Sequence, residues 1–267
     1  MNNAHQKIID SHVHLDHIHK RTPQRIRWMQ ELGIIPISWA FAMHIETRSD
    51  LKKYLRTQAD TIQELSRNGF KCFFLSGIHP RNIPSDLKAE DVKTLLAPFL
   101  DDPLCLGIGE IGLETGTQRE QEILAAQLDM EKTLRHMGKK FGIHTPRNNK
   151  PEITKKLLSA LSLYPGIETF TVIDHCTPET IDSVLKKGYW AGVTLSPVKA
   201  SLKDLEKIVS HHPEDLQRIL CNTDSGTVFY EDIYMLYRSD AFLPDMRNKL
   251  TFENAFYFFT PESSEIL

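Results

Sequence analysis

The chain has 267 residues, with 32 basic and 35 acidic side chains and a formal net charge of −3 when histidine is neutral. This length is close to the roughly 250 residues of a typical α/β barrel. The slight acidity argues against broad, salt-driven binding of duplex DNA but leaves room for a local basic site.

Other features of the sequence argue against several further classes of protein. No run of about 18 apolar residues is present, so we expect no membrane span. Residues 1–10 lack a basic segment followed by an apolar one, which argues against a secretion signal. The 4 cysteines are far apart and form no CxxC pair, so they are expected to be reduced thiols of a cytoplasmic protein.

Short apolar runs of strand-like composition recur along the chain. They cover residues 7–10, 36–42, 71–77, 104–113, 142–144, 169–174, 190–195 and 218–222. Most of them start about 30 residues apart, the length of one strand–helix–strand unit. Several are continuously apolar, as expected for strands that are covered on both faces.

Helical patterns fill the intervals between these runs. Apolar residues between positions 51 and 65 form one stripe, and those between 123 and 137 form another. The expected first residues or N-terminal caps are Ser49, Thr117 in a capping box with Glu120, Thr177 before Pro178, and Ser201.

Strands that alternate with helices predict a mainly parallel sheet. Eight such units in a chain of this length predict a (β/α)8 TIM barrel, with residues 1–267 as a single domain. A doubly wound open sheet is the alternative, but its glycine-rich dinucleotide fingerprint is missing after the first run.

Polar residues able to bind a metal lie at the ends of five of the predicted strands. They are His12, His14, Glu110, His144, His175 and Asp224. In a barrel the carboxyl ends of the strands form one rim, so these side chains are expected to converge. Imidazole and carboxylate without thiolate suit zinc, manganese, iron or, less well, magnesium. Six ligands exceed the three typical of one catalytic zinc, which favours two metals bridged by a carboxylate.

Each of these residues also has an ordinary structural interpretation. A single histidine can be a hydrogen-bonded core or surface residue, and Glu110 can be an ion-pair partner inside a barrel. Asp224 can cap a turn, since residues 222–226 have good turn chemistry. Six such residues at strand ends are harder to explain separately. His17 and His19 are expected to lie in a polar loop that faces solvent or substrate.

Several segments resemble the TatD-related metal-dependent hydrolases of the amidohydrolase superfamily. The segment IIDSHVHLDH at 8–17 is similar to the family's first-strand motif, and GIHP at 77–80 to its signature after the third strand. GIGEIGLE at 107–114 is similar to the GEIGLD segment. The fifth-strand histidine, NTDSG at 222–226 and FENAFYFF at 252–259 continue the resemblance in matching order.

The resemblance implies a dinuclear hydrolytic site. His12, His14, Glu110 and Asp224 would hold the first divalent ion (zinc, manganese or magnesium), and Glu110 would bridge to a second. His144 and His175 would complete the second site. Asp224 would accept a proton from water and return it to the leaving group. The resemblance also places His79 of the GIHP segment near the substrate, although a hydrogen bond that staples the loop is an equally good interpretation.

Four departures from the family pattern bear on the substrate. Asn222 stands where the family usually has glutamate, and Glu114 where it usually has aspartate. Pro146 interrupts the usual fifth-strand HxR motif, and the loop after His175 is rebuilt. The predicted metal ligands survive these changes, whereas the predicted pocket wall does not.

The leading functional hypothesis is a metal-dependent phosphodiesterase. Its expected activity is that of a deoxyribonuclease acting on DNA 3′ ends. Candidate phosphate-binding residues are Arg147, Arg81, Arg21 and Lys199. The alternative is a metallohydrolase of a small lactone, ester or amide, and a third hypothesis is a non-catalytic barrel. Trp39, Phe41 and Trp190 are expected to be packing residues rather than platforms for bases. No membrane contact and no obligatory protein partner are expected.

Overall fold

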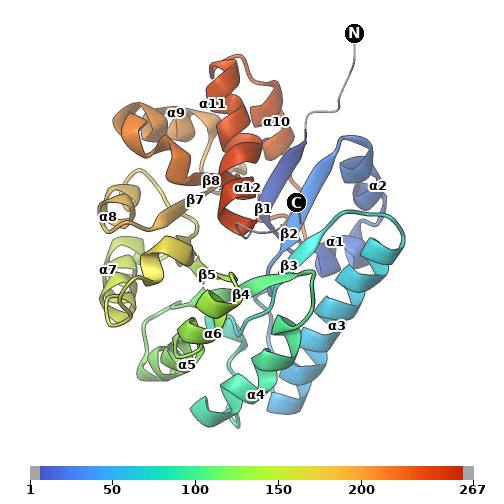
Figure 1. The fold of residues 1–267 in the computed structure, drawn as a ribbon, viewed down its shortest axis with the longest axis vertical. Coiled ribbons are helices and arrows are strands. Elements are labelled where there is room, and N and C mark those ends of the chain that lie inside the picture. Colours follow the sequence, from blue (N-terminus) through green and yellow to red (C-terminus); the bar gives the residue numbers. More distant parts are fainter. Residues whose placement is uncertain (1–6, 261–267) are drawn as a thin grey trace.

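The structure is a computed structural model that describes residues 7–260, and it shows an eight-stranded parallel sheet surrounded by helices (Figure 1). The strands are β1 Ile8–Val13, β2 Ile34–Ser38, β3 Phe73–Leu75, β4 Cys105–Gly112, β5 Lys140–His144, β6 Thr171–Ile173, β7 Trp190–Thr194 and β8 Ile219–Asn222. Each strand pairs with the next one along the chain. The predicted (β/α)8 barrel is therefore confirmed.

Helices follow the strands and cover the outside of the barrel (Figure 1). They are α1 Leu15–Arg21, α2 Gln24–Glu31, α3 Arg48–Arg67, α4 Ala89–Leu100, α5 Gln118–Leu128, α6 Glu131–His136, α7 Lys150–Leu161, α8 Ile181–Lys186, α9 Leu202–His211, α10 Asp232–Arg238, α11 Pro244–Asn248 and α12 Asn254–Phe259. Short 3₁₀ segments are η1 Pro80–Asn82, η2 Ile167–Phe170 and η3 Pro213–Arg218, and η4 Lys249–Glu253 is a π-helical turn. No helix among residues 7–260 is long and apolar enough to span a bilayer.

The barrel closes between β1 and the segment that follows β8. The Asp224 amide donates to the His12 carbonyl at 2.9 Å, and the His14 amide donates to the Ser225 carbonyl at 2.7 Å. Below this point, the Asp10 carboxylate accepts bonds from the Thr223 amide and hydroxyl at 3.0 and 2.6 Å. The bonds that close the barrel therefore also fix the backbone of three predicted metal ligands.

Apolar side chains fill the barrel interior and separate its two ends. Ile9, Ile37, Leu75 and Leu220 belong to this interior cluster, which Phe258 of α12 also joins. Because residues two apart on a strand share one face, the same strands carry apolar side chains at one level and polar ones further along. The helix α12 covers one end of the barrel, and the polar site lies at the carboxyl ends of the strands.

The boundaries of several elements differ from their predictions. The Thr47 hydroxyl, rather than that of Ser49, accepts the Asp50 amide bond at the start of α3. The helix α8 begins after Thr180, so the predicted start at Thr177 is wrong. The predicted caps Thr117 and Ser201 are confirmed, since each accepts a bond from the amide three residues later. The predicted apolar stripe from 123 to 137 is divided between α5 and α6.

Candidate metal centre

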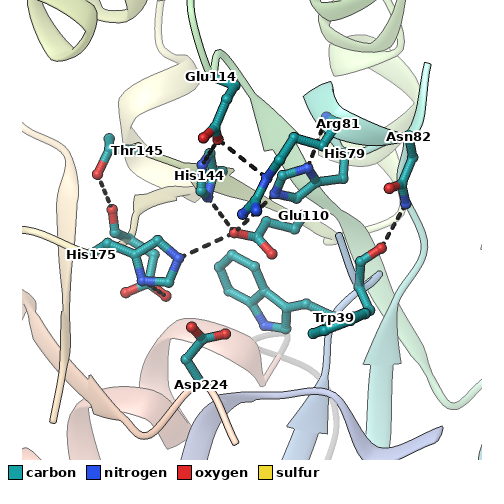
Figure 2. A network of polar contacts seen from close by, with 12 residues as sticks. Trp39, His79, Arg81, Asn82, Glu110, Glu114, His144, Thr145, His175 and Asp224 are labelled. Carbon is teal, nitrogen blue, oxygen red and sulfur yellow. Dashed lines mark hydrogen bonds and ion pairs between the residues drawn. The ribbon is translucent and has the colours of Figure 1, made fainter. Parts of the chain in front are cut away.

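The six predicted ligands come together at the carboxyl ends of the strands. His12 lies within β1 and His14 directly after it, Glu110 lies within β4, and His144 ends β5. His175 and Asp224 lie two residues beyond β6 and β8. Five of the six line one pocket with a volume of about 580 Å³, and His12 is fully buried behind it. Figure 2 shows Glu110 between His144, His175 and Asp224.

Two clusters can be distinguished around Glu110. We call His12, His14 and Asp224 the β1/β8 cluster, and His144 with His175 the β5/β6 cluster. The ligand atoms of His12, His14 and Glu110 all lie within 4.8 Å of one another. Glu110 contacts the β5/β6 cluster through Oε1, at 2.6 Å from His144 Nδ1 and 3.2 Å from His175 Nε2. The carboxylate of Glu110 therefore lies between both clusters.

The tautomer of His14 follows from its hydrogen bonds. Its Nδ1 lies 3.0 Å from the Trp39 carbonyl oxygen, which can only accept, so Nδ1 carries the proton. In the neutral ring, Nε2 then presents a lone pair to Asp224 Oδ1 at 2.8 Å. Two acceptors this close require a cation between them, either a proton or a metal ion.

His12 presents a second ring nitrogen in the same way. Its Nδ1 lies 2.5 Å from Asp174 Oδ2, which orients the ring. Its Nε2 is buried, has no hydrogen-bond partner among the described residues, and lies 3.5 Å from Glu110 Oε2. An unpaired buried nitrogen is unfavourable, and a metal ion would satisfy it. The donor set and this orphan atom fit a divalent cation.

Asp174 is held firmly in its position beside His12. Asn222 Nδ2 donates to Asp174 Oδ1 at 2.9 Å. Gly192 of β7 leaves the room for this carboxylate, because a Cβ added there would lie 2.1 Å from Asp174 Oδ1. Trp39 supports the other face of His12, with ring centroids 4.1 Å apart and nearly parallel planes. These contacts fix the direction of His12 Nε2.

The β5/β6 cluster differs because the ammonium group of Lys199 lies against one of its rings. His144 Nε2 lies 2.9 Å from Glu114 Oε2, while its Nδ1 contacts Glu110. His175 Nδ1 lies 2.7 Å from the Thr194 hydroxyl and 3.0 Å from Lys199 Nζ. A metal ion at His175 would be repelled by this ammonium group unless the lysine side chain moved away.

Two of the predicted ligands adopt a strained backbone conformation. His175 has φ of 60° and Asp224 has φ of 52°, and they are two of the three described non-glycine residues with positive φ. Residues other than glycine rarely adopt this region, and such outliers gather at functional sites. The outliers at these two strand ends therefore support a functional role for the rim.

The surroundings of Glu110 and His12 favour positive charge on His12. Burial raises the pKa of Glu110, but the charges of His79, His12 and His144 outweigh it and hold that pKa well below its usual range. Burial lowers the pKa of His12, yet the Glu110 charge and the Asp174 hydrogen bond raise it to about 10. The same field that stabilises a proton on His12 would attract a metal cation.

His79 is suited to donate a hydrogen bond rather than to bind a metal. Its Nδ1 accepts the Arg81 amide bond at 3.0 Å, so the proton of the neutral ring lies on Nε2. That buried Nε2 has no hydrogen-bond partner within residues 7–260 and lies 3.7 Å from Glu110 Oε1. This geometry is compatible with both predicted roles of His79. Its Nδ1 stabilises the loop through a hydrogen bond, and its Nε2 faces the site, where a substrate could bind.

The predicted phosphate-binding residues are only partly brought together. Arg81, Arg147 and Lys199 line the pocket, whereas Arg21 is not among its lining residues. Arg81 Nε lies 3.4 Å from Glu114 Oε2, so this guanidinium is already paired (Figure 2). Arg147 also lines the pocket and is exposed.

Some expectations about the rim are wrong. His17 and His19 lie in α1 rather than in a polar loop. The ring of His17 packs on Phe41 with centroids 4.0 Å apart, and burial lowers its pKa to about 4. Phe41 packs on His14 and His17 and also lines the pocket. Trp39 and Trp190 do pack inside the protein, as predicted.

Asp174 and Thr194 were not predicted to belong to the site. For Asp174 the sequence does contain an indication, since this residue ends a predicted strand directly before a predicted ligand. Thr194 has none, because its position beside His175 Nδ1 arises from the pairing of distant segments.

Comparisons with known proteins agree with this geometry. The profile of the family described as TatD related DNase matches residues 9–228. A metal-dependent hydrolase of Methanocaldococcus jannaschii is 28% identical over 171 residues, and the match covers 64% of this chain and 64% of that protein, which is less than two thirds of its length.

Two solved structures are similar to this chain to different degrees. The TatD-like protein of Archaeoglobus fulgidus is 29% identical, has a TM-score of 0.71, and is matched over 94% of this chain and 99% of that one. A 5-carboxyvanillate decarboxylase of Sphingomonas paucimobilis is 11% identical with a TM-score of 0.62, over 95% of this chain and 99% of that one. The latter similarity shows the fold alone.

Proposed function

Because the chain belongs to the TatD-related DNase family of metal-dependent hydrolases, we propose that it hydrolyses a phosphoric ester with two divalent metal ions. The proposed substrate is a phosphodiester at the 3′ end of a DNA strand. The observation that carries the proposal is the pair of ring nitrogens, His12 Nε2 and His14 Nε2, that face the oxygens of Glu110 and Asp224.

The residues present divide naturally between two metal ions. His12, His14, Glu110 and Asp224 would hold the first ion. His144 and His175 would hold the second, with Glu110 as the bridge. When bound, zinc, manganese or magnesium would lower the pKa of a water molecule and stabilise the charge that develops on the attacked phosphoryl oxygen.

Asp224 is the proposed acid–base residue. Its side chain is 20% exposed and faces the pocket, so it can reach water and substrate. It would accept the proton of the attacking water as the new P–O bond forms, and return that proton to the leaving oxygen as the other P–O bond breaks. Lys199 and His14 hold its pKa well below the usual range despite burial, so the carboxylate starts as a base.

Two further residues are proposed to bind the substrate. His79 would donate its Nε2 proton to an anionic oxygen, because that donor faces the site and has no described partner. Arg147 would bind a phosphate group at the rim through its guanidinium.

A small-molecule metallohydrolase is the second candidate. The pocket volume of about 580 Å³ lies within the range of sites for small ligands. Its wall near Phe41, Ala42 and Val198 is apolar, which would suit a lactone, ester or amide as well as a nucleotide base.

The two candidates are separated by one experiment. A 5′-labelled single-stranded DNA and a panel of lactones, esters and amides would be incubated with the protein and manganese, zinc or magnesium. Stepwise loss of 3′ nucleotides, reduced about 10²–10⁴-fold in Asp224→Asn, would support the nuclease. The surface variant Asp182→Asn is the matched control, since its exposed carboxylate pairs with exposed Lys186. Turnover of a small ester with intact DNA would support the second candidate instead.

A further inference from the structure

Lys199 is presented to the metal centre by a hydrogen-bonded turn between β7 and α9. The Lys199 amide donates to the Ser196 carbonyl at 3.1 Å. The Ala200 amide donates back to the Thr194 carbonyl at 3.1 Å, and Ser196 donates to Ala200 at 3.2 Å. These backbone bonds direct the side chain inward, where it is only 13% exposed.

The ammonium of Lys199 contacts one member of each cluster. It donates to Asp224 Oδ2, which belongs to the β1/β8 cluster. It also lies 3.0 Å from Nδ1 and 3.4 Å from Nε2 of His175, which belongs to the β5/β6 cluster. Because it is this close to both ring nitrogens, the ammonium group lies over the ring of His175 rather than on the axis of one lone pair, and it opposes a metal ion there through its positive charge. The amine thus bridges a carboxylate and an imidazole, the two ligand types of the metal centre.

The charges of the side chains at the site also favour the binding of one divalent ion over two. Glu110, Glu114, Asp174 and Asp224 supply four negative charges in mutual contact with the histidines. Arg81 on Glu114 and Lys199 on Asp224 supply two positive charges. Lys150, which is half-buried nearby, adds a third positive charge and donates to the neutral oxygens of Thr145 and His175. With neutral histidines, one negative charge is left, so one divalent ion already exceeds the balance and a second is disfavoured while Lys199 stays in place.

We propose that Lys199 serves as an internal cation that competes with the second metal ion. The protein then binds one metal tightly at the β1/β8 cluster, and the second binds only when it displaces the ammonium from His175 and Asp224. This inference rests on the proposed function, because it presupposes the metal ligands named above. It adds a residue that sets how many metals are bound at a given metal concentration.

The test measures metal stoichiometry rather than activity. Metal-free wild type, Lys199→Met and Lys203→Met would be dialysed against a series of free zinc concentrations, and bound zinc per chain measured. Lys203 is the control because it lies on α9, is exposed and carries the same charge. Lys199→Arg is included because it keeps the charge. Thermal unfolding of each metal-free protein verifies that it is folded.

We expect wild type, Lys203→Met and Lys199→Arg to bind one zinc tightly and a second more weakly. In Lys199→Met the second zinc should bind about tenfold more tightly or better, because the competing charge is gone. The affinity for the first zinc should change less.

Superimposable binding curves for wild type and Lys199→Met would overturn this inference, as would weaker second binding in that variant. Failure of the proposed function gives a different result. In that case wild type would bind no zinc, or a His12→Ala variant would bind zinc as wild type does.

Discussion

At the ends of β1 and β8, the histidine nitrogens that face the pocket meet only carboxylate oxygens. At the ends of β5 and β6, carboxylates, a hydroxyl and an ammonium group already contact both nitrogens of each ring. In the first cluster Asp174 and the Trp39 carbonyl hold the Nδ1 protons on the far side of the rings. In the second cluster Glu114 holds the far nitrogen of His144 in the same way, but the ammonium group of Lys199 lies against His175.

The two clusters contain the same types of ligand, but their surroundings favour the binding of a metal ion to different degrees. A ligand whose far nitrogen is already fixed binds a metal without losing other contacts. A ligand that lies against an ammonium group binds a metal ion against charge repulsion, and the binding free energy is reduced accordingly. We therefore expect two metals of unequal affinity, with Glu110 common to both.

The largest effect is expected from Glu110→Gln, because this carboxylate contacts both clusters. Loss of its charge should weaken both metals by more than about a hundredfold and abolish measurable hydrolysis. Zinc content after dialysis measures this, with the exposed Glu122→Gln on α5 as the control. A variant that retained one zinc as tightly as wild type would show that Glu110 is not shared.

A pair of variants tests the inequality of the clusters directly. His14→Ala should lose the tight metal, with an affinity loss of more than about a hundredfold, since Nε2 faces Asp224. His144→Ala should retain that metal and lose only the weak one. Isothermal titration with manganese distinguishes them, and equal losses in the two variants would contradict the comparison.

A smaller effect is expected from the residues that orient the ligands. Asp174→Ala should weaken the tight metal by about 10–100-fold, because His12 loses the partner of its Nδ1. Thr194→Val should leave the tight metal unchanged, because its hydroxyl contacts His175. The same titration measures both. An Asp174→Ala variant with wild-type affinity would show that the ring of His12 needs no such support.

The smallest effect concerns the loop that carries Glu114. Glu120 accepts bonds from the amides of Glu114, Thr115 and Gly116 at 2.8–2.9 Å. Burial opposes ionisation, but the Thr115 hydroxyl and these amides hold its pKa below the usual value of about 4.5. Glu120→Gln should reduce the free energy of unfolding by about 1 kcal/mol at neutral pH.

The sign of the pH dependence follows from that lowered pKa. The contribution of Glu120 is present above its unfolded pKa of about 4.5 and is lost as the pH falls through its lower folded value. The gap between wild type and Glu120→Gln should therefore narrow in acid. Urea denaturation at several pH values measures it, and a gap that widens in acid would contradict this assignment.

The barrel and the meeting of the ligands could be predicted from the sequence because both follow from strand order. Apolar runs at regular spacing indicate the strands, and residues such as His144 and Asp224 follow from their ends. The contacts that orient the ligand side chains could not be predicted in this way. It depends on contacts between distant strands, such as Asp174 with His12, whose sequence separation is 162 residues.

The turn that carries Lys199 shows the same limit. The sequence indicates a basic residue near the rim, but only the turn from Ser196 to Ala200 directs its amine to Asp224. The error for His17 has a related cause, since a segment rich in polar residues is nevertheless the helix α1. Local composition does not reveal the packing of that helix on Phe41.

The central claim is that the two clusters bind metal unequally. Crystals grown with one equivalent of zinc and measured at the zinc absorption edge would test it most directly. We predict one strong anomalous peak about 2.0–2.2 Å from His12 Nε2 and His14 Nε2, and a much weaker one at His144 and His175. Two peaks of equal height, or a single peak at the β5/β6 cluster, would contradict the claim.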